Sequence, residues 1–212
     1  MVQLAITCAG VAGLYVSKDW NLIFKRYEAM LMIPSIVVAV VIMCGIACCK
    51  TCSRKVPMNY ICLLVYTLAI TLLVMAVAGK YNPESVLLCA SMTASVTFGI
   101  VMMGCVLKGD MYWCFGCLAG PVFGSIPVAL FVTFGVLNGS NSIYGSPGLM
   151  LLFGYLLCTI LSIYIIYDVG IIIDKNVGLS YDDYIIAALI LYSDIIYMFL
   201  WLLSLFGGGS SD

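Results

Sequence analysis

The sequence predicts an all-α polytopic membrane protein, a bundle of seven transmembrane helices. Of its 212 residues, 64% are apolar and 9% are charged, a composition outside the range of soluble globular proteins. The apolar runs are about 20 residues long, the length that an α-helix needs to cross roughly 30 Å of hydrocarbon. They are continuous and do not alternate with polar residues, which argues against a transmembrane β-barrel. A helical bundle is the remaining class.

The predicted seven-helix membrane domain covers residues 1–206, and residues 207–212 form a flexible C-terminal tail. Short polar or turn-forming segments separate the seven apolar runs. The predicted spans are 1–16, 31–49, 60–79, 86–107, 111–137, 149–173 and 184–206.

The first span is slightly short and lacks the basic start of a signal peptide, so we expect a first helix with little or no N-terminal tail. A charged connector leads to the second span, where Pro34 lies near the start and removes no backbone hydrogen bond. The most basic loop of the chain follows at residues 50–55. The third span ends at Gly79, a plausible helix stop, and Asn82-Pro83 forms a turn signal.

The fourth and fifth spans are separated by a turn so tight that the two helices are predicted to be antiparallel neighbours. The fifth span carries Gly116, Gly120 and Gly124 at four-residue spacing, the pattern that lets two helix backbones approach closely. Pro121 and Pro127 in the same span predict a kink. We interpret the glycines as packing residues.

An uncharged polar loop precedes the sixth span, and a short acidic loop joins it to the seventh. Seven spans place the two termini on opposite sides of the membrane. The loops on one side hold five basic residues and those on the other hold four, which favours a cytosolic N-terminus. We expect an endomembrane, such as the endoplasmic reticulum or Golgi membrane, or the plasma membrane.

Two lone aspartates in the last two spans, Asp168 and Asp194, are the leading candidates for a functional site. A carboxylate within an apolar transmembrane helix is costly, so such residues usually face the bundle interior and mark an ion or proton pathway. The two helices are antiparallel and joined by a short loop, so the two carboxyl groups can meet. Asp182 and Asp183 are explained instead as helix N-cap residues.

Two carboxylates held together in a low dielectric cannot both ionise cheaply, so Asp168 and Asp194 are predicted to share a proton. Loss of that proton leaves an oxygen site that suits Ca²⁺, a hard cation. We therefore predict a proton sensor and a transient Ca²⁺ site, with Ca²⁺ as the permeant ion and no cofactor. The alternative is an inert, buried, hydrogen-bonded pair.

The eleven cysteines fall into three groups. Those inside apolar runs are predicted to be small core residues: Cys8, Cys62, Cys89, Cys105 and Cys158. A cluster at the end of the second span consists of Cys44, Cys48, Cys49 and Cys52, and we interpret it either as plain thiols or as a site of reversible palmitoylation, at Cys48, Cys49 and Cys52. Cys114 and Cys117 match C-x-x-C, but an apolar helix is a poor setting for zinc or redox chemistry.

Several motifs resemble one family. Tyr167-Asp168 in the sixth span, the S-Y-D-D cap and A-A-L-I-L-Y-S-D-I-I in the seventh span together resemble the transmembrane BAX inhibitor motif family. The segments around Arg54 to Tyr60 and Tyr81 to Cys89 resemble its lifeguard, or glutamate-receptor-associated, branch. Their order and spacing cover essentially the whole chain.

The resemblance implies a seven-helix bundle that leaks Ca²⁺ in a pH-dependent way and protects cells from death signals. It implies that Asp168 and Asp194 form a proton-sharing pair, and that a basic residue, Arg54 or Lys50, acts as an ionic lock on it. The sequence departs from the family pattern at Val169-Gly170, which replaces the usual T-Q, at Tyr181, which replaces a proline, and at Tyr197, where asparagine is common.

Two other classes of membrane protein are disfavoured. Paired intramembrane aspartates also occur in presenilin-like proteases, but the second aspartate lacks their G-x-G-D motif, so no enzyme activity is expected. A retinal protein is disfavoured because the seventh span has no lysine for a Schiff base. Two alternatives stay open: a non-conducting protein that binds a receptor or apoptosis regulator in the membrane, and a Ca²⁺/H⁺ exchanger. Net charge near zero gives no reason to expect a nucleic-acid partner.

Overall fold

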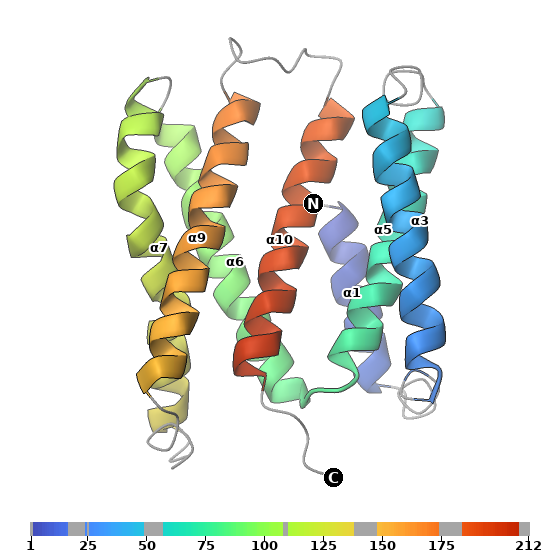
Figure 1. Ribbon diagram of the computed structural model, residues 1–212, viewed down its shortest axis with the longest axis horizontal. Helices are drawn as coiled ribbons and strands as arrows, with labels where there is room; N and C mark the ends of the chain where they lie inside the picture. Colours follow the sequence, from blue (N-terminus) through green and yellow to red (C-terminus); the bar gives the residue numbers. More distant parts are fainter. Residues whose placement is uncertain are drawn as a thin grey trace. The chain divides into compact units, whose positions relative to one another are not determined.

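The computed structural model describes residues 2–16, 24, 26–48, 57–107, 110–137, 148–173 and 184–207. Within these residues it contains seven α-helices and no β-strand, and each helix overlaps one predicted span (Figure 1). The helices are α1 (Val2–Val16), α3 (Glu28–Cys48), α5 (Met58–Ala78), α6 (Pro83–Val106), α7 (Asp110–Leu137), α9 (Gly148–Ile173) and α10 (Tyr184–Phe206). The predicted all-α fold class is confirmed.

The helices are apolar and long enough to identify an integral membrane protein. Four described segments are long enough to cross a bilayer: Met58–Ala78, Pro83–Val106, Leu151–Ile172 and Ile185–Phe206. Three shorter apolar helical stretches accompany them: Val2–Val16, Met30–Ile46 and Leu118–Thr133. Large apolar side chains such as Leu87 and Phe98 are exposed, an arrangement that suits contact with lipid rather than water.

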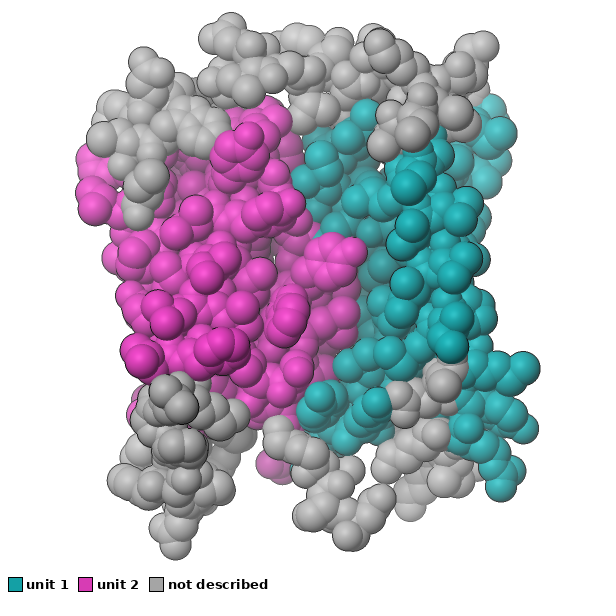
Figure 2. Space-filling model, in the orientation of Figure 1, with its two compact units in different colours: residues 1–83, 179–193, 209–212 teal, residues 84–178, 194–208 magenta. Residues whose placement is uncertain are grey.

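The chain divides into two compact units, shown in different colours in Figure 2. Unit 1 consists of residues 1–83, 179–193 and 209–212, and unit 2 of residues 84–178 and 194–208. Helix α10 contributes to both, since the division falls between Ser193 and Asp194. Both predicted site aspartates therefore belong to unit 2.

In unit 1, α1 and α3 both pack against α5. Leu14 at the end of α1 is fully buried in a cluster with Phe24, Met75 and Ala76. A polar stripe runs beside this cluster: Gln3 Nε2 donates a hydrogen bond to Thr67 Oγ1 at 3.0 Å. Hydrogen bonds between hydroxyl and amide side chains satisfy these groups where no water is present, so the two helices are held in one register.

Tyr15 closes the other end of the α1 and α5 pair. Helix α5 ends at Ala78, and the N–H of Gly79 donates to the carbonyl of Met75 at 3.0 Å, as expected of a helix stop. The Tyr15 hydroxyl donates to the carbonyl oxygens of Ala78 at 2.6 Å and Tyr81 at 3.0 Å. The last carbonyls of a helix have no partner within the helix, so Tyr15 satisfies groups that would otherwise be unpaired.

In unit 2, α7 packs closely against α9. A Cβ atom added to Gly116 or Gly120 would lie 2.8 Å and 2.4 Å from side-chain carbons of Ile166 and Ile163. At Gly124 the added atom would lie 2.7 Å from the backbone of α9 itself. The predicted role of these glycines in helix packing is confirmed. Helix α7 continues without a break through both of its prolines.

The predicted burial of the cysteines is wrong for two of them. Cys89 and Cys158 are buried and Cys62 is partly buried, but Cys8 and Cys105 are exposed. Lipid chains are as apolar as a protein core, so a thiol is equally stable on either face of a transmembrane helix. Apolar character in such a helix therefore does not indicate which side faces the interior.

Candidate functional site

Asp168 and Asp194 lie on different helices of unit 2 and meet. Asp168 belongs to the C-terminal part of α9, and Asp194 lies near the middle of α10. Their carboxyl groups lie close enough to form a hydrogen bond with one another. Two carboxyl groups can form such a bond only when one of them carries a proton. The structure thus brings together the two residues that the sequence singled out.

The two carboxyl groups differ in their surroundings. Asp194 is 7% exposed, whereas Asp168 is only partly buried. The Oδ2 atom of Asp194 is buried and has no hydrogen-bond partner among the described residues. A buried polar atom without a partner is costly by about 1–3 kcal/mol, and more if it is charged. Ionising Asp194 would therefore be costly unless a cation or a hydrogen-bond donor reached this group.

The described part of unit 2 contains no lysine, arginine or histidine that could neutralise the pair. The residues predicted to act as an ionic lock, Arg54 and Lys50, lie outside the described residues. Asp182 and Asp183, predicted to cap the last helix, also lie outside them. The described part of the unit thus offers no basic side chain as a counter-charge to the pair.

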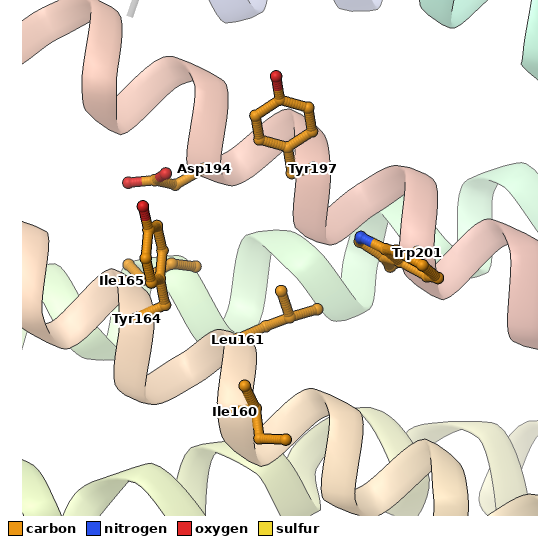
Figure 3. A pocket seen from close by; sticks show the side chains of 7 residues that line it. All are labelled: Ile160, Leu161, Tyr164, Ile165, Asp194, Tyr197 and Trp201. Atoms are coloured by element: carbon orange, nitrogen blue, oxygen red, sulfur yellow. The ribbon is translucent and has the colours of Figure 1, made fainter.

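A cavity of about 290 Å³ opens beside Asp194 in unit 2 (Figure 3). Asp194, Tyr197 and Trp201 form its α10 side at spacings of three and four residues, which place them on one face of the helix. The hydroxyl of Tyr164 on α9 points toward the Asp194 carboxyl group (Figure 3). Its remaining lining residues are Ile160, Leu161 and Ile165. The cavity is an apolar space with one carboxylate in its wall.

The residues just before Asp194 are fixed by hydrogen bonds within unit 1. The Tyr192 hydroxyl lies 2.8 Å from Thr7 Oγ1, and Ser193 Oγ lies 2.7 Å from the Tyr66 hydroxyl. The rings of Tyr66 and Tyr192 meet edge to face, with their centroids 6.2 Å apart. These contacts hold α10 in a defined rotation immediately before the carboxylate. These hydrogen bonds were not predicted, although hydroxyl residues next to an aspartate in an apolar helix could have indicated a hydrogen-bond network.

A similar contact holds α9 close to Asp168. The buried hydroxyl of Tyr112 on α7 donates to the carbonyl oxygen of Ile166 at 2.8 Å, two residues before Asp168. This bond and the glycine contacts fix α9 against α7. Tyr112 was also missed, because a tyrosine in an apolar run gives no indication of its partner.

The arrangement gives an incomplete site for a metal ion. The described residues contain no group of three or more His, Cys, Asp or Glu side chains that could hold one. Ca²⁺ takes 6–8 oxygen ligands, so two carboxyl groups would need water or carbonyl oxygens to complete the shell. Among the predicted lipidation residues, Cys48 ends α3, and Cys49 and Cys52 lie outside the described residues. The side chains of Cys114 and Cys117 lie outside them as well.

Comparison with known proteins identifies the family of this chain. Residues 1–211 match the family model described as inhibitor of apoptosis-promoting Bax1. The chain is similar to human protein lifeguard 3, with 27% identity over 97% of this chain and 65% of the human protein, and to the mouse protein of the same name, with 25% identity over the same shares. It is also similar to protein LIFEGUARD 3 of Arabidopsis thaliana, with 32% identity over 71% of this chain and 58% of that protein.

The chain thus spans 65% of the length of the human and mouse relatives. No solved structure matches it. The match over residues 1–211, the helical membrane fold and the resemblance of the motifs agree with one another. The protein belongs to the Bax inhibitor family with the lifeguard proteins, a family of membrane proteins linked to the inhibition of apoptosis.

Proposed function

We propose that this protein is a pH-sensitive Ca²⁺ leak channel of a cellular membrane, which modulates Ca²⁺ homeostasis and thereby inhibits apoptosis. The observation that carries the proposal is the close approach of the carboxyl groups of Asp168 and Asp194 within apolar helices. Ionisable groups at such positions are expensive to keep in a membrane, and they mark ion and proton pathways more often than they serve packing alone.

The chemistry of the pair links protons to Ca²⁺. With one shared proton the pair carries a single negative charge, and without it the pair offers two carboxylates to a hard divalent cation. Protons and Ca²⁺ therefore compete for the same oxygens, and each lowers the affinity of the other. Because water must supply the missing ligands, binding is weak enough for the ion to leave again, which suits a leak rather than storage.

The ionic lock is part of the same proposal. A cation from Arg54 or Lys50 would neutralise the deprotonated pair and exclude Ca²⁺ from it. Replacing Arg54 by Ala would then raise Ca²⁺ flux, whereas replacing Arg54 by Lys would keep it low. We place the N-terminus in the cytosol and the protein in an endomembrane or the plasma membrane, and we retain palmitoylation of the cysteines around Cys49 as a proposal.

The decisive test is Ca²⁺ entry into proteoliposomes across a pH series. Wild-type protein should give a flux that changes with pH, and Asp168→Asn combined with Asp194→Asn should lose both the flux and its pH response. Wild-type levels of flux and pH response in the double variant would refute the role of the pair. A folded, inserted wild-type protein without flux would instead point to action through a bound receptor or apoptosis regulator.

A Ca²⁺/H⁺ exchanger is a second candidate, favoured by the close approach of the two carboxyl groups, which would let them share a proton. A leak passes Ca²⁺ without a fixed proton count, whereas an exchanger moves protons outward as Ca²⁺ enters. A pH dye trapped in the same vesicles separates the two. Proton efflux in a constant ratio to Ca²⁺ entry, unchanged when valinomycin and K⁺ clamp the membrane potential, would assign exchange.

A further inference from the structure

We infer that the cavity beside Asp194 binds one acyl chain of a bilayer phospholipid, whose head group stays at the membrane surface near the C-terminal end of α10. Three observations point to this ligand. The cavity has apolar walls, it is open on the side of the membrane, and its size and depth match a single hydrocarbon chain. The inference goes beyond the proposed function and does not depend on whether the protein conducts Ca²⁺.

The walls of the cavity offer almost no polar surface to a ligand. Three of its seven lining residues are aliphatic, Ile160, Leu161 and Ile165, and three are aromatic. The remaining residue, Asp194, is 7% exposed, so very little of it is available for contact with a ligand. The described part of unit 2 has no lysine or arginine that could hold an anionic head group. The cavity therefore selects hydrocarbon and leaves the head group elsewhere.

The cavity is also open to the bilayer. The side chains of Ile160, Tyr164, Tyr197 and Trp201 line it while half or more of their own surface is exposed. On a helix that crosses the hydrocarbon region, such exposed surface meets lipid, so a chain can enter sideways from the bilayer. Protein atoms are packed more densely than a liquid, and a chain that fits the cavity therefore gains dispersion contacts relative to the fluid lipid.

The size of the cavity matches one chain. Its volume is about 290 Å³, and a methylene group fills a volume close to that of a water molecule, ~30 Å³, so about ten carbons occupy it. Asp194 and Tyr164 lie at one end of the cavity and Trp201 at the other (Figure 3). The seven residues from Asp194 to Trp201 span about 10.5 Å of α10, and ten carbons of an extended chain span about 12 Å, at ~1.25 Å per carbon. Volume and length agree on a cavity one chain wide, which is too narrow for the fused rings of a sterol.

The depth of the cavity fits a chain that enters from the C-terminal end of α10. Trp201 lies five residues before Phe206, or about 7.5 Å, and Asp194 lies twelve residues before it, or about 18 Å. Helix α9 gives the same depth. Phe206 packs against Gly154, where an added Cβ atom would lie 2.8 Å from the ring, and Ile165 follows eleven residues later, or about 16.5 Å. A chain that starts at the level of Phe206 needs about 14 carbons to reach Asp194.

Native mass spectrometry of the purified protein tests this dependence on chain length. The protein is kept in a short-chain detergent and titrated with didecanoyl, dimyristoyl or distearoyl phosphatidylcholine. These lipids share one head group, and the decanoyl chain ends about four carbons short of Asp194. Dimyristoyl phosphatidylglycerol, with the same chains as the second lipid and an anionic head group, shows whether the head group contributes.

We expect one molecule of dimyristoyl or distearoyl lipid to remain bound, with half-saturation at a concentration at least about tenfold below that of the didecanoyl lipid, because a short chain leaves the deep end of the cavity empty. The phosphatidylcholine and the phosphatidylglycerol with myristoyl chains should bind equally. Equal retention of all three phosphatidylcholines, or a preference set by the head group, would overturn the inference.

A variant in the cavity wall locates the bound chain. Ile160→Phe narrows the cavity and should raise the half-saturation of the dimyristoyl lipid to that of the didecanoyl lipid. Val122→Phe is the matched control, because Val122 on α7 is 62% exposed, close to the 63% of Ile160, and does not line the cavity. Equal binding by the wild type and Ile160→Phe, or an equal loss in Val122→Phe, would assign the lipid to the general surface of the bundle.

The remaining outcomes decide between ligands. Displacement of the dimyristoyl lipid by an equimolar amount of myristic acid or of cholesterol would assign the cavity to a free fatty acid or a sterol and overturn the choice of a phospholipid chain. If Ile160→Phe does not fold, the chain-length series in the wild type still decides, because it requires no variant.

Discussion

Replacing Gly124 by Ala should destabilise the protein through a single methyl group. The added Cβ would lie 2.4 Å from Thr159 Oγ1 and 2.7 Å from the backbone Cα and N of the same residue. The hydroxyl can rotate away but the backbone cannot, so α9 would have to move away from α7. Overpacking costs about 1–3 kcal/mol, and contact with backbone places this site at the upper end of that range.

The net effect follows from two opposing terms. Alanine is favoured over glycine within a helix by about 1 kcal/mol, which offsets part of the clash. We therefore expect a net loss of about 2 kcal/mol, and for a chain of this size about 2–4 °C in Tm per kcal/mol, or about 4–8 °C in all. Thermal unfolding of the purified protein in a mild detergent, followed by circular dichroism, measures the shift.

Gly13 supplies the matched control. A Cβ atom added there would meet nothing within 4 Å, so Gly13→Ala gains helix propensity without a clash. It should leave Tm unchanged or raise it by a few degrees, about 0.5–1 kcal/mol. Gly116→Ala should fall between the two, because its added atom meets only the tip of a side chain, Ile166 Cγ2. Wild-type stability of Gly124→Ala, or an equal loss in Gly13→Ala, would refute the packing argument.

The remaining predictions concern α10 and its carboxylate. Tyr192→Phe removes the hydroxyl that bonds to Thr7 and should lower the free energy of unfolding by about 0.5–1.5 kcal/mol. The control, Tyr197→Phe, changes a half-exposed ring and should lower it by less than about 0.5 kcal/mol. Equal losses in the two variants would contradict the role given to the hydrogen bond. If Ca²⁺ and a proton compete for Asp168 and Asp194, as proposed, the apparent affinity for Ca²⁺ should rise with pH. Protection from thermal unfolding by Ca²⁺, followed across a pH series, measures this affinity. The rise of affinity with pH should vanish in Asp168→Asn, and a wild-type affinity that does not change with pH would exclude competition at the pair.

Much of the architecture could be predicted from the sequence because each helix is specified by its own residues. A run of about 20 apolar residues is sufficient to predict a membrane helix, since the bilayer requires every backbone group to be paired within the segment. The lone aspartates stood out for the same reason, because a charge in such a run is costly wherever its partner lies. The glycines at four-residue spacing likewise predict a close helix contact from the sequence alone, since only small residues let two helices approach closely.

Other features required the folded chain. Cys8 and Cys105 were expected in the core but are exposed, because lipid and protein interior are equally apolar and hydropathy does not separate them. The partners of Tyr15 and Tyr112 were not predicted, because a carbonyl acceptor is present at every residue and leaves no mark in the sequence.

The sequence by itself determined the membrane class, the approximate helices, and which two carboxylates are out of place in apolar surroundings. The tertiary structure decided that these carboxyl groups meet, that Asp194 lines a cavity, and that α10 is anchored just before Asp194 by Thr7, which lies 185 residues from Tyr192 in the chain. The residues of each segment determine whether it is stable as a helix in lipid. Hydrogen-bond partners depend instead on how helices that are distant in sequence pack together, so only the folded protein shows them.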